Sequence, residues 1–237
     1  IILKFLNFIC YTDYMNIHKF TLFSYLSIKD NLLFPLDKFL SNSEVIEICK
    51  NTLYNKKFFP LPFFLSADEK DLKDTENNGI NLFFNKKSYG TVKIKSISFF
   101  DKNKMIDLLF KKIKQGNFKH PFKEFIKQSG NYLIETEPFS NKKKIINKKL
   151  IGFATRNIPH KGHEKIIKHF SKNKKLIVNI FENSSNDKKI DSSKTLIAYK
   201  KFIKKNKLNS IVSLKKIKLP SFLLGPRQAA LHAIVEK

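Results

Sequence analysis

The chain has 237 residues, 42% of them hydrophobic, which is enough for one large domain or two smaller ones. Its 46 Lys and Arg residues against 20 Asp and Glu residues give a formal net charge of +26, which excludes an acidic protein and favours anionic partners. The two cysteines, Cys10 and Cys49, exclude a disulfide framework and a cysteine-rich metal site, and they fit a reducing cytoplasm.

The positive charge is spread along the whole chain. Arg occurs only at Arg156 and Arg227, while Lys, Ile, Asn and Phe are abundant, Gly is scarce and Trp is absent. This composition is typical of proteins from strongly AT-rich genomes, and no clustered nucleic-acid recognition motif accompanies it. We therefore expect nucleic acid to bind only non-specifically, through net charge.

The first ten residues are apolar but too few to span a bilayer, and no small-residue cleavage site follows them. The sequence predicts neither a membrane partner nor a signal peptide. The chain begins with Ile1, which suggests an incomplete N-terminus, with Met15 as a candidate start and residues 1–14 as a candidate non-native segment.

The first half mixes helix and strand signals. Ser43 and Glu44 predict the cap of a helix over residues 45–51. Further along, Asn77, Asn78 and Gly79 predict a turn. Other predicted elements are strands over 59–65, 80–84 and 90–100, a turn at 101–104, a helix over 105–112 and a lysine-rich connector over 142–149.

The second half alternates strands with helices. Apolar runs predict buried strands over 150–153, 176–181 and 211–214, and apolar spacing predicts helices over 163–170 and 195–205. This alternation implies a parallel, doubly wound sheet, an α/β fold that binds its ligand outside the carboxyl ends of its strands.

Residues 154–164 (ATRNIPHKGHE) lie at such a strand end. Pro159 is predicted at the first helical position, which places His160 and His163 on one side of the first helical turn. Free N–H groups, two imidazoles and the forked guanidinium of Arg156 suit a polyphosphate. Taken singly, either histidine is as well explained as an ordinary surface group.

A last motif covers residues 219–233 (LPSFLLGPRQAALHA). Gly225 predicts a tight turn and Pro226 a helix start, which places Arg227 at a second helix N-terminus. His232 falls inside that helix, where it is expected to pack or cap.

At residues 154–164 the chain resembles the ATP sulfurylase (sulfate adenylyltransferase) family, whose signature is Gln-Thr-Arg-Asn-Pro-x-His-x-x-His-Glu. The positions that match are Thr155, Arg156, Asn157, His160, His163 and Glu164, with Pro159 one position along. Ala154 stands where the family has a Gln that touches both ATP and sulfate.

Other segments resemble the same family. Residues 33–42, 59–65, 120–121 and 130–134 resemble pieces of its N-terminal domain, and residues 219–233 resemble its Met-Arg-Tyr-Ala-Gly-Pro-Arg-Glu-Ala-x-x-His-Ala motif. In that motif the stretch before Gly225 is shorter and has no Arg, and Gln228 replaces Glu. The family's Gly-Arg-Asp-His motif does not occur, so an incomplete catalytic domain is expected.

The resemblance implies two domains. Residues 1–146 would form a PUA-like domain built around a small β-barrel, an α+β fold. Residues 147–237 would form part of a Rossmann-like nucleotidylyltransferase domain of the His-x-Gly-His type.

The resemblance also implies a reaction in which Mg-ATP and sulfate give adenylyl sulfate and pyrophosphate. ATP would contact Ala154, Thr155, Arg156, Asn157, His160 and His163, and sulfate would contact Ala154, Arg156 and Arg227. Thr155 and Asn157 would orient phosphates, and the histidines would stabilise the pyrophosphate. Mg²⁺ would arrive with ATP, with no metal held by the protein, and the complete protein would be a cytoplasmic homo-oligomer.

Two alternatives stay open. Ala154 and the short stretch before Gly225 favour a nucleotidyltransferase of the same fold with another acceptor. A chain that retains only the fold would instead be a non-catalytic basic binding protein. The sequence decides neither the acceptor nor the direction of the reaction.

Overall fold

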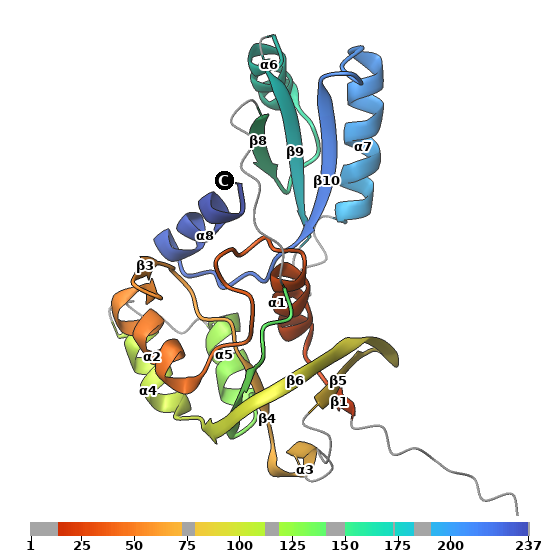
Figure 1. Ribbon diagram of the computed structural model, residues 1–237. Coiled ribbons are helices and arrows are strands. Elements are labelled where there is room, and N and C mark those ends of the chain that lie inside the picture. Colours follow the sequence, from red (N-terminus) through yellow and green to blue (C-terminus); the bar gives the residue numbers. More distant parts are fainter. Residues whose placement is uncertain are drawn as a thin grey trace, which may run out of the picture.

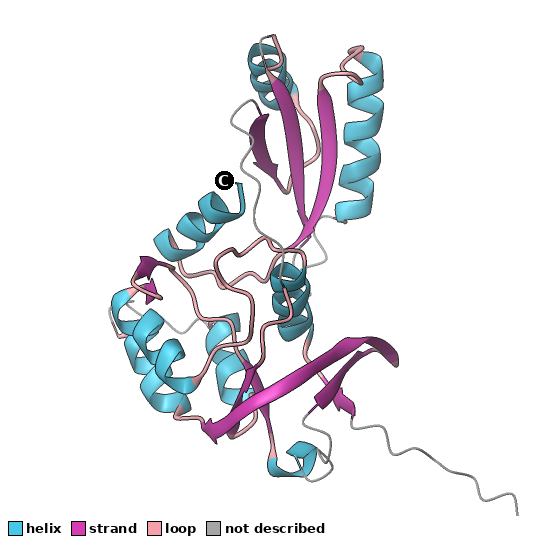
Figure 2. Ribbon diagram, viewed as in Figure 1, coloured by secondary structure: helices cyan, strands magenta, loops and turns pink. Residues whose placement is uncertain are grey.

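The computed structural model describes residues 14–72, 79–111, 119–140, 150–172, 174–182 and 191–236. Two separate sheets lie at opposite ends of this part of the chain, with helices between and beside them (Figures 1 and 2). The first sheet belongs to the N-terminal half and the second to the C-terminal half, so the predicted α+β and α/β halves are both present.

The helices and strands follow one another as β1 (Tyr14–Asn16), α1 (Lys19–Lys29), α2 (Asn42–Asn51), β2 (Leu53–Tyr54), β3 (Lys57–Phe58), β4 (Leu65–Ala67), α3 (Glu69–Leu72), β5 (Gly79–Phe84), β6 (Lys87–Phe99), α4 (Lys102–Phe110), α5 (Pro121–Gln128), β7 (Tyr132–Thr136), β8 (Leu150–Thr155), α6 (Lys161–Phe170), β9 (Lys175–Glu182), α7 (Ser192–Lys205), β10 (Val212–Lys218) and α8 (Pro226–Glu236).

The N-terminal sheet is open. Its strand order is β1-β5-β6-β7-β4, and the two edge strands β1 and β4 have three residues each and do not pair with each other. The expected small β-barrel is therefore not seen in the described residues. Aromatic side chains occupy the space instead: Phe20 of α1 stacks on Phe122 of α5 with ring centroids 5.1 Å apart.

Local details of this half differ from expectation. Helix α2 begins at Asn42, and its cap is Ser41 rather than Ser43: Ser41 Oγ accepts the N–H of Glu44, and the Glu44 carboxylate accepts the N–H of Ser41. The predicted strand over 59–65 is buried, but only Leu65 is in a strand, because the two prolines, at 60 and 62, lack the N–H that a ladder needs. Helix α4 starts three residues before its predicted start, with Asp101 as its cap.

The remaining predictions of this half have mixed outcomes. Strands β5 and β6 confirm those predicted over 80–84 and 90–100. Helix α5 was not predicted at all. The turn residues 77–78, the connector over 142–149 and residues 1–13 lie outside the described residues.

The C-terminal sheet has three parallel strands in the order β10-β9-β8. All three predicted strands are confirmed, as are helices α6 and α7 over the two predicted spans. Strand β9 is central and buried, but β8 is an edge on which only Thr155 is fully buried, so the expectation of a buried first strand is wrong. Ile151 and Phe153 of this strand pack against the smaller hydrophobic core, and the Glu236 carboxylate of α8 lies close to Gly152.

Two hydrophobic cores hold the described residues together. The smaller one lies in the three-stranded unit and contains Ile167, Leu176, Val178, Ile180, Tyr199, Ile203 and Val212. The larger one fills the N-terminal half but also includes Phe181, Phe222 and Leu231. Phe222 packs edge-on against Phe20 and Phe122, with ring centroids 4.8 and 4.7 Å away. Helix α8 and the strand ends before it are thus anchored in the N-terminal core.

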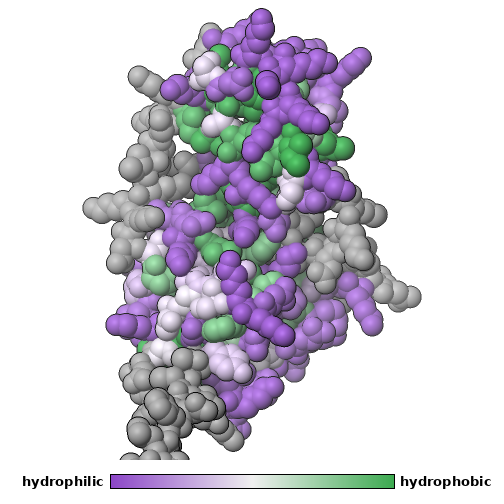
Figure 3. All heavy atoms as spheres, turned by 90° about the vertical axis from the view of Figure 1, so that its right-hand side faces the viewer, coloured by the Kyte–Doolittle hydropathy of each residue, from purple (hydrophilic) through white to green (hydrophobic). Residues whose placement is uncertain are grey.

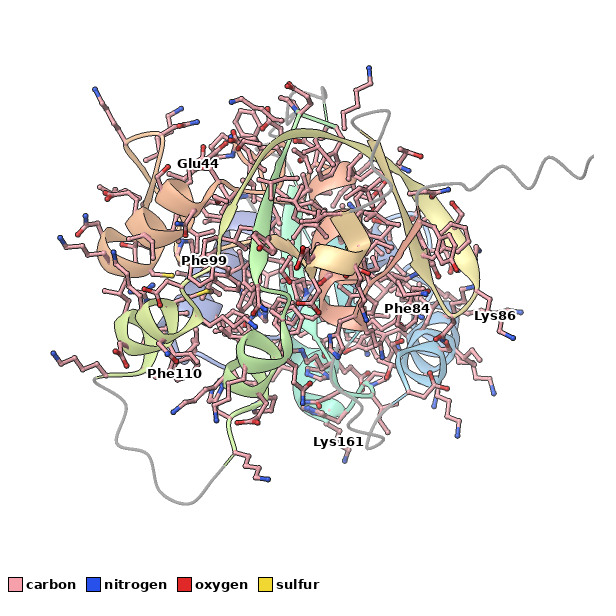
Figure 4. The ribbon with its side chains drawn as sticks, turned by 90° about the horizontal axis from the view of Figure 1, so that it is seen from below. Glu44, Phe84, Lys86, Phe99, Phe110 and Lys161 are labelled. Carbon is pink, nitrogen blue, oxygen red and sulfur yellow. The ribbon has the colours of Figure 1, made fainter. Side chains whose placement is uncertain are left out.

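Charged side chains cover the surface without forming one patch. Lys86, in the turn between β5 and β6, and Lys161, at the start of α6, lie at separate outer edges of the molecule (Figure 4). On the face that Figure 3 presents, hydrophilic side chains dominate and hydrophobic ones gather in the upper part. None of the described helices is long and apolar enough to cross a membrane.

Candidate active site

The loop between β8 and α6 carries most of the predicted site residues. Strand β8 ends at Thr155 and α6 begins at Lys161, so residues 156–160 lie at the carboxyl edge of the sheet (Figure 1). The helix cap is His160, whose Nδ1 accepts the backbone N–H of Gly162 at 3.2 Å. Pro159 therefore precedes the cap and is not the first helical residue as expected.

The two histidines of the motif stack on each other. The ring centroids of His160 and His163 are 3.8 Å apart with an interplanar angle of 28°. Gly162 makes this arrangement possible, because a Cβ at that position would lie 3.0 Å from Cε1 of His160. Phe153 packs edge-on against His163, at 5.3 Å. The predicted clustering of the two imidazoles on one side of the first helical turn is therefore present.

His163 is also contacted by α7, which packs with α6 in the smaller hydrophobic core. Its Nδ1 lies 3.0 Å from the hydroxyl of Tyr199, a residue with no exposed surface, and Thr155 hydrogen-bonds to the same hydroxyl. Burial lowers the pKa of His163, and the neighbouring His160 lowers it further, while a hydrogen bond to the backbone of Ile158 opposes both effects. His163 is therefore favoured in its neutral form.

Arg156 follows Thr155 at the end of β8 and is half-buried. Burial lowers the pKa of its guanidinium, and its buried Nε has no hydrogen-bond partner in the described part of the chain. An unsatisfied buried donor on a cation costs free energy, which an anionic ligand would recover.

His232 of α8 lies beside Arg156. Its ring stacks on Phe181 of β9, with centroids 4.7 Å apart and an interplanar angle of 9°. Burial, and after it the charge of Arg156, lowers the pKa of His232 to about 4. The sequence predicts only packing or capping for His232. Its place next to the site depends on its contact with Phe181 at the end of β9, and a tertiary contact of this kind does not follow from local sequence pattern.

Arg227 does not join this cluster. Gly225 adopts a positive φ of 48° and Pro226 starts α8, as predicted. The guanidinium of Arg227, however, donates to the carbonyl oxygens of Ile48 at 3.2 Å and Cys49 at 2.8 Å, at the C-terminal end of α2. A third contact, to the carbonyl of Pro60, is 3.3 Å long. Its predicted contact with sulfate is not tested by this structure.

The other predicted residues of the loop are placed as follows. Thr155 is buried, and its Oγ1 accepts the N–H of Asn157 at 3.1 Å. Ala154 and Asn157 are exposed at the sheet edge. A cavity of about 680 Å³ lies elsewhere, between β1, β4 and the end of α5, and contains none of the predicted site residues. The described residues contain no group of three or more His, Cys, Asp and Glu side chains that could hold a metal.

Comparison with known families identifies both halves. Residues 12–136, more than half of the chain, match the family model of the PUA-like domain. Over these residues the chain belongs to the PUA-like domain family. Residues 135–237 match the family model of ATP-sulfurylase, so the resemblance to that family is confirmed. The site loop and helix α8 both lie within this ATP-sulfurylase region (residues 135–237).

Comparison with solved structures supports the fold. A hexameric APS kinase from Thiobacillus denitrificans is similar, with a TM-score of 0.62 and 12% identity over 95% of this chain. At that identity the likeness concerns the fold alone. The chain spans about 45% of the length of that protein. Comparison with curated protein sequences gave no significant match.

Proposed function

We propose that this chain is a sulfate adenylyltransferase that binds Mg-ATP at the loop between β8 and α6. The observation that carries the proposal is the stacked pair His160–His163 in the same loop as Arg156, whose buried Nε has no partner in the described residues. Two imidazoles and a guanidinium in one loop at a strand's carboxyl edge suit a polyphosphate chain. The match of residues 135–237 to ATP-sulfurylase supports the same assignment.

In the proposed reaction, a sulfate oxygen attacks the α-phosphorus of ATP. A new phosphorus–oxygen bond forms, the bond to the bridging oxygen breaks, and pyrophosphate leaves. Sulfate is already an anion, so no general base is needed; the reaction needs positioning and neutralisation of charge. Arg156 would hold sulfate, Thr155 and Asn157 would orient phosphates, and His160 and His163 would donate to the departing pyrophosphate.

Binding of ATP is the first part of the proposal to test. Calorimetric titration with a non-hydrolysable ATP analogue and Mg²⁺ should show binding to the wild-type chain. The double variant His160→Ala/His163→Ala should bind more weakly, by about 1.5–3 kcal/mol per lost charge-assisted hydrogen bond. His169→Ala is the matched control, because His169 is exposed on the same helix and packs edge-on against Phe170, away from the histidine pair. Equal affinities of the double variant and the control would contradict the proposal.

Catalysis is tested by pyrophosphate release with ATP, Mg²⁺ and sulfate, with molybdate as a second acceptor. Release that depends on sulfate and is lost in Arg156→Ala supports the proposed role of Arg156. A second candidate, transfer to a different acceptor, is favoured by Ala154, whose methyl group is exposed and offers no hydrogen bond where the family has Gln. ATP binding without sulfate-dependent release would favour this candidate.

We also propose a cytoplasmic homo-oligomer. The buried thiol of Cys49, whose pKa burial raises to about 12, fits a reducing compartment, and the similar APS kinase structure is hexameric. Light scattering after size-exclusion chromatography measures the mass directly, and a mass of 27.7 kDa, that of one chain, would contradict an oligomer.

A further inference from the structure

Tyr199 connects α7 to the histidine pair through His163. It is fully buried, yet its sequence neighbourhood is an ordinary amphipathic helix with lysines on its outer face. A buried phenolic hydroxyl needs hydrogen-bond partners. Those of Tyr199 are Nδ1 of His163, at 3.0 Å, and the side chain of Thr155. Both partners belong to the candidate active site.

The direction of the bond to His163 follows from the single hydrogen of the Tyr199 hydroxyl. Oγ1 of Thr155 accepts the N–H of Asn157 at 3.1 Å and donates to the carbonyl oxygen of Asn157 at 3.3 Å. Nδ1 of His163, 3.0 Å away, is an acceptor for the Tyr199 hydrogen. Burial raises the pKa of Tyr199, which keeps that hydrogen on the phenol.

His160 shows the same arrangement with a different donor. Its Nδ1 accepts the backbone N–H of Gly162, so a neutral His160 carries its hydrogen on Nε2. With Nδ1 of His163 accepting from Tyr199, both stacked rings would carry their hydrogens on Nε2. Two stacked rings with the same tautomer offer two N–H donors to neighbouring oxygens of one ligand, once the hydrogen bond of His163 to the backbone of Ile158 is exchanged for the ligand.

We propose that Tyr199 is a positioning residue that donates to Nδ1 of His163 and thereby holds the imidazole in the tautomer with its hydrogen on Nε2. The importance of this tautomer for phosphate binding rests on the function proposed above. The tautomer itself is a property of the unliganded chain. The two claims can therefore fail separately.

Nitrogen NMR of the full chain labelled with ¹⁵N-histidine tests the tautomer. Spectra that correlate ring nitrogens with ring hydrogens distinguish protonated from unprotonated nitrogens, and His163→Gln assigns the signals of His163. We expect an unprotonated Nδ1 and a protonated Nε2 in the wild-type chain. In Tyr199→Phe we expect the Nδ1 signal to shift and the ring to populate both tautomers. A protonated Nδ1 in the wild-type chain would overturn the proposal without any variant.

Titration with the ATP analogue gives the second readout. Tyr199→Phe should weaken binding by about threefold to tenfold, the effect of one neutral hydrogen bond. Tyr25→Phe is the matched control, because Tyr25 is a buried tyrosine of the N-terminal half whose hydroxyl is hydrogen-bonded to the exposed Lys29 and lies far from the site in the fold. Unchanged affinity in Tyr199→Phe alongside a wild-type chain that binds would contradict the positioning role. A wild-type chain with the expected tautomer but no ATP binding would contradict only the proposed function.

Discussion

The amide of Gln228 fixes the hydrogen-bonding state of His232. Its Oε1 accepts the backbone N–H of Phe222 at 2.7 Å, so its Nε2, 2.9 Å from Nε2 of His232, must be the donor. Nε2 of His232 is therefore an acceptor and the ring is neutral, with its hydrogen on Nδ1. In the ATP sulfurylase motif that residues 219–233 resemble, this position is Glu, whose carboxylate cannot donate to a histidine.

Gln228→Glu should reverse that state. A carboxylate can still accept the N–H of Phe222, but it cannot donate to His232, so the imidazole must place a hydrogen on Nε2, and the nearby negative charge favours the protonated ring. The pKa of His232 of about 4 already includes the charge of Arg156, and we expect it to rise by about 1–3 pH units. Histidine NMR over a pH series measures it. An unchanged titration of His232 would show that the amide does not control the ring.

Gly162→Ala should weaken binding of the ATP analogue while leaving the free energy of unfolding almost unchanged. The new Cβ would lie 3.0–3.1 Å from the His160 ring, which must move and give up its cap of α6, at a cost of about 1 kcal/mol. Ala gains about 1 kcal/mol over Gly inside a helix, so the free energy of unfolding should change little. Affinity for the ATP analogue should nevertheless fall.

Denaturant unfolding and calorimetry on the same preparation check this pair of outcomes. A variant with wild-type affinity would show that the position of the His160 ring does not matter to the ligand. A variant that loses several kcal/mol of stability would show that the helix start depends on more than this cap.

Arg227→Lys tests whether this arginine serves the fold. Three carbonyl oxygens of Ile48, Cys49 and Pro60 accept hydrogen bonds from its guanidinium, and an ammonium group cannot reproduce that fork. We expect the variant to lose about 1.5–3 kcal/mol of unfolding free energy. The opposite result, full stability with weakened sulfate dependence of pyrophosphate release, would support the sulfate contact predicted from the sequence.

Glu135 should contribute stability that depends on pH. It is buried and accepts hydrogen bonds from Lys38, Lys95 and Ser96, which together outweigh the effect of burial and hold its pKa at about 2, against an ordinary 4.5. A depressed pKa means that the folded state prefers the carboxylate. The contribution is therefore complete above pH 4.5 and is lost as the pH falls from 4.5 towards 2.

Comparison of wild type with Glu135→Gln between pH 2 and 6 measures the contribution of Glu135 to the free energy of unfolding. The difference in unfolding free energy should be about 3–3.5 kcal/mol at pH 6, on the basis of ~1.4 kcal/mol per pH unit of pKa difference, and should shrink towards pH 2. A difference that stays constant over this range would mean that protonation of Glu135 is not coupled to folding.

Local pattern was sufficient to predict the strands and helices of the ATP-sulfurylase region. Strand β9 and helix α7 carry uninterrupted apolar periodicity, and Gly225 and Pro226 determine where α8 begins. The clustering of His160 and His163 also follows from spacing along one helix. These features depend on residues that are close in the sequence.

Tertiary neighbours explain what was missed. The exposure of β8 depends on which strands flank it, and the open N-terminal sheet depends on how Phe20 and Phe122 fill the space beside it. The sequence of helix α5 does carry a local helix pattern, with Pro121 at its start and apolar residues at 122, 125 and 126. The partners of Arg227 and Tyr199 come from elements far apart in the sequence.

Strands β9 and β10 each enter both hydrophobic cores without an intervening loop. Ile180 belongs to the smaller core and Phe181 to the larger, and Val212 and Ile217 divide in the same way along β10. The two family matches meet at residues 135–136. The larger hydrophobic core nevertheless includes Phe222 and Leu231, which lie far beyond that boundary in the sequence. A fragment that begins after the family boundary would therefore leave Phe222 and the apolar side of α8 in water, and its partner fragment would lack part of its own interior. Attempts to produce the two halves separately should yield two aggregating polypeptides rather than two domains.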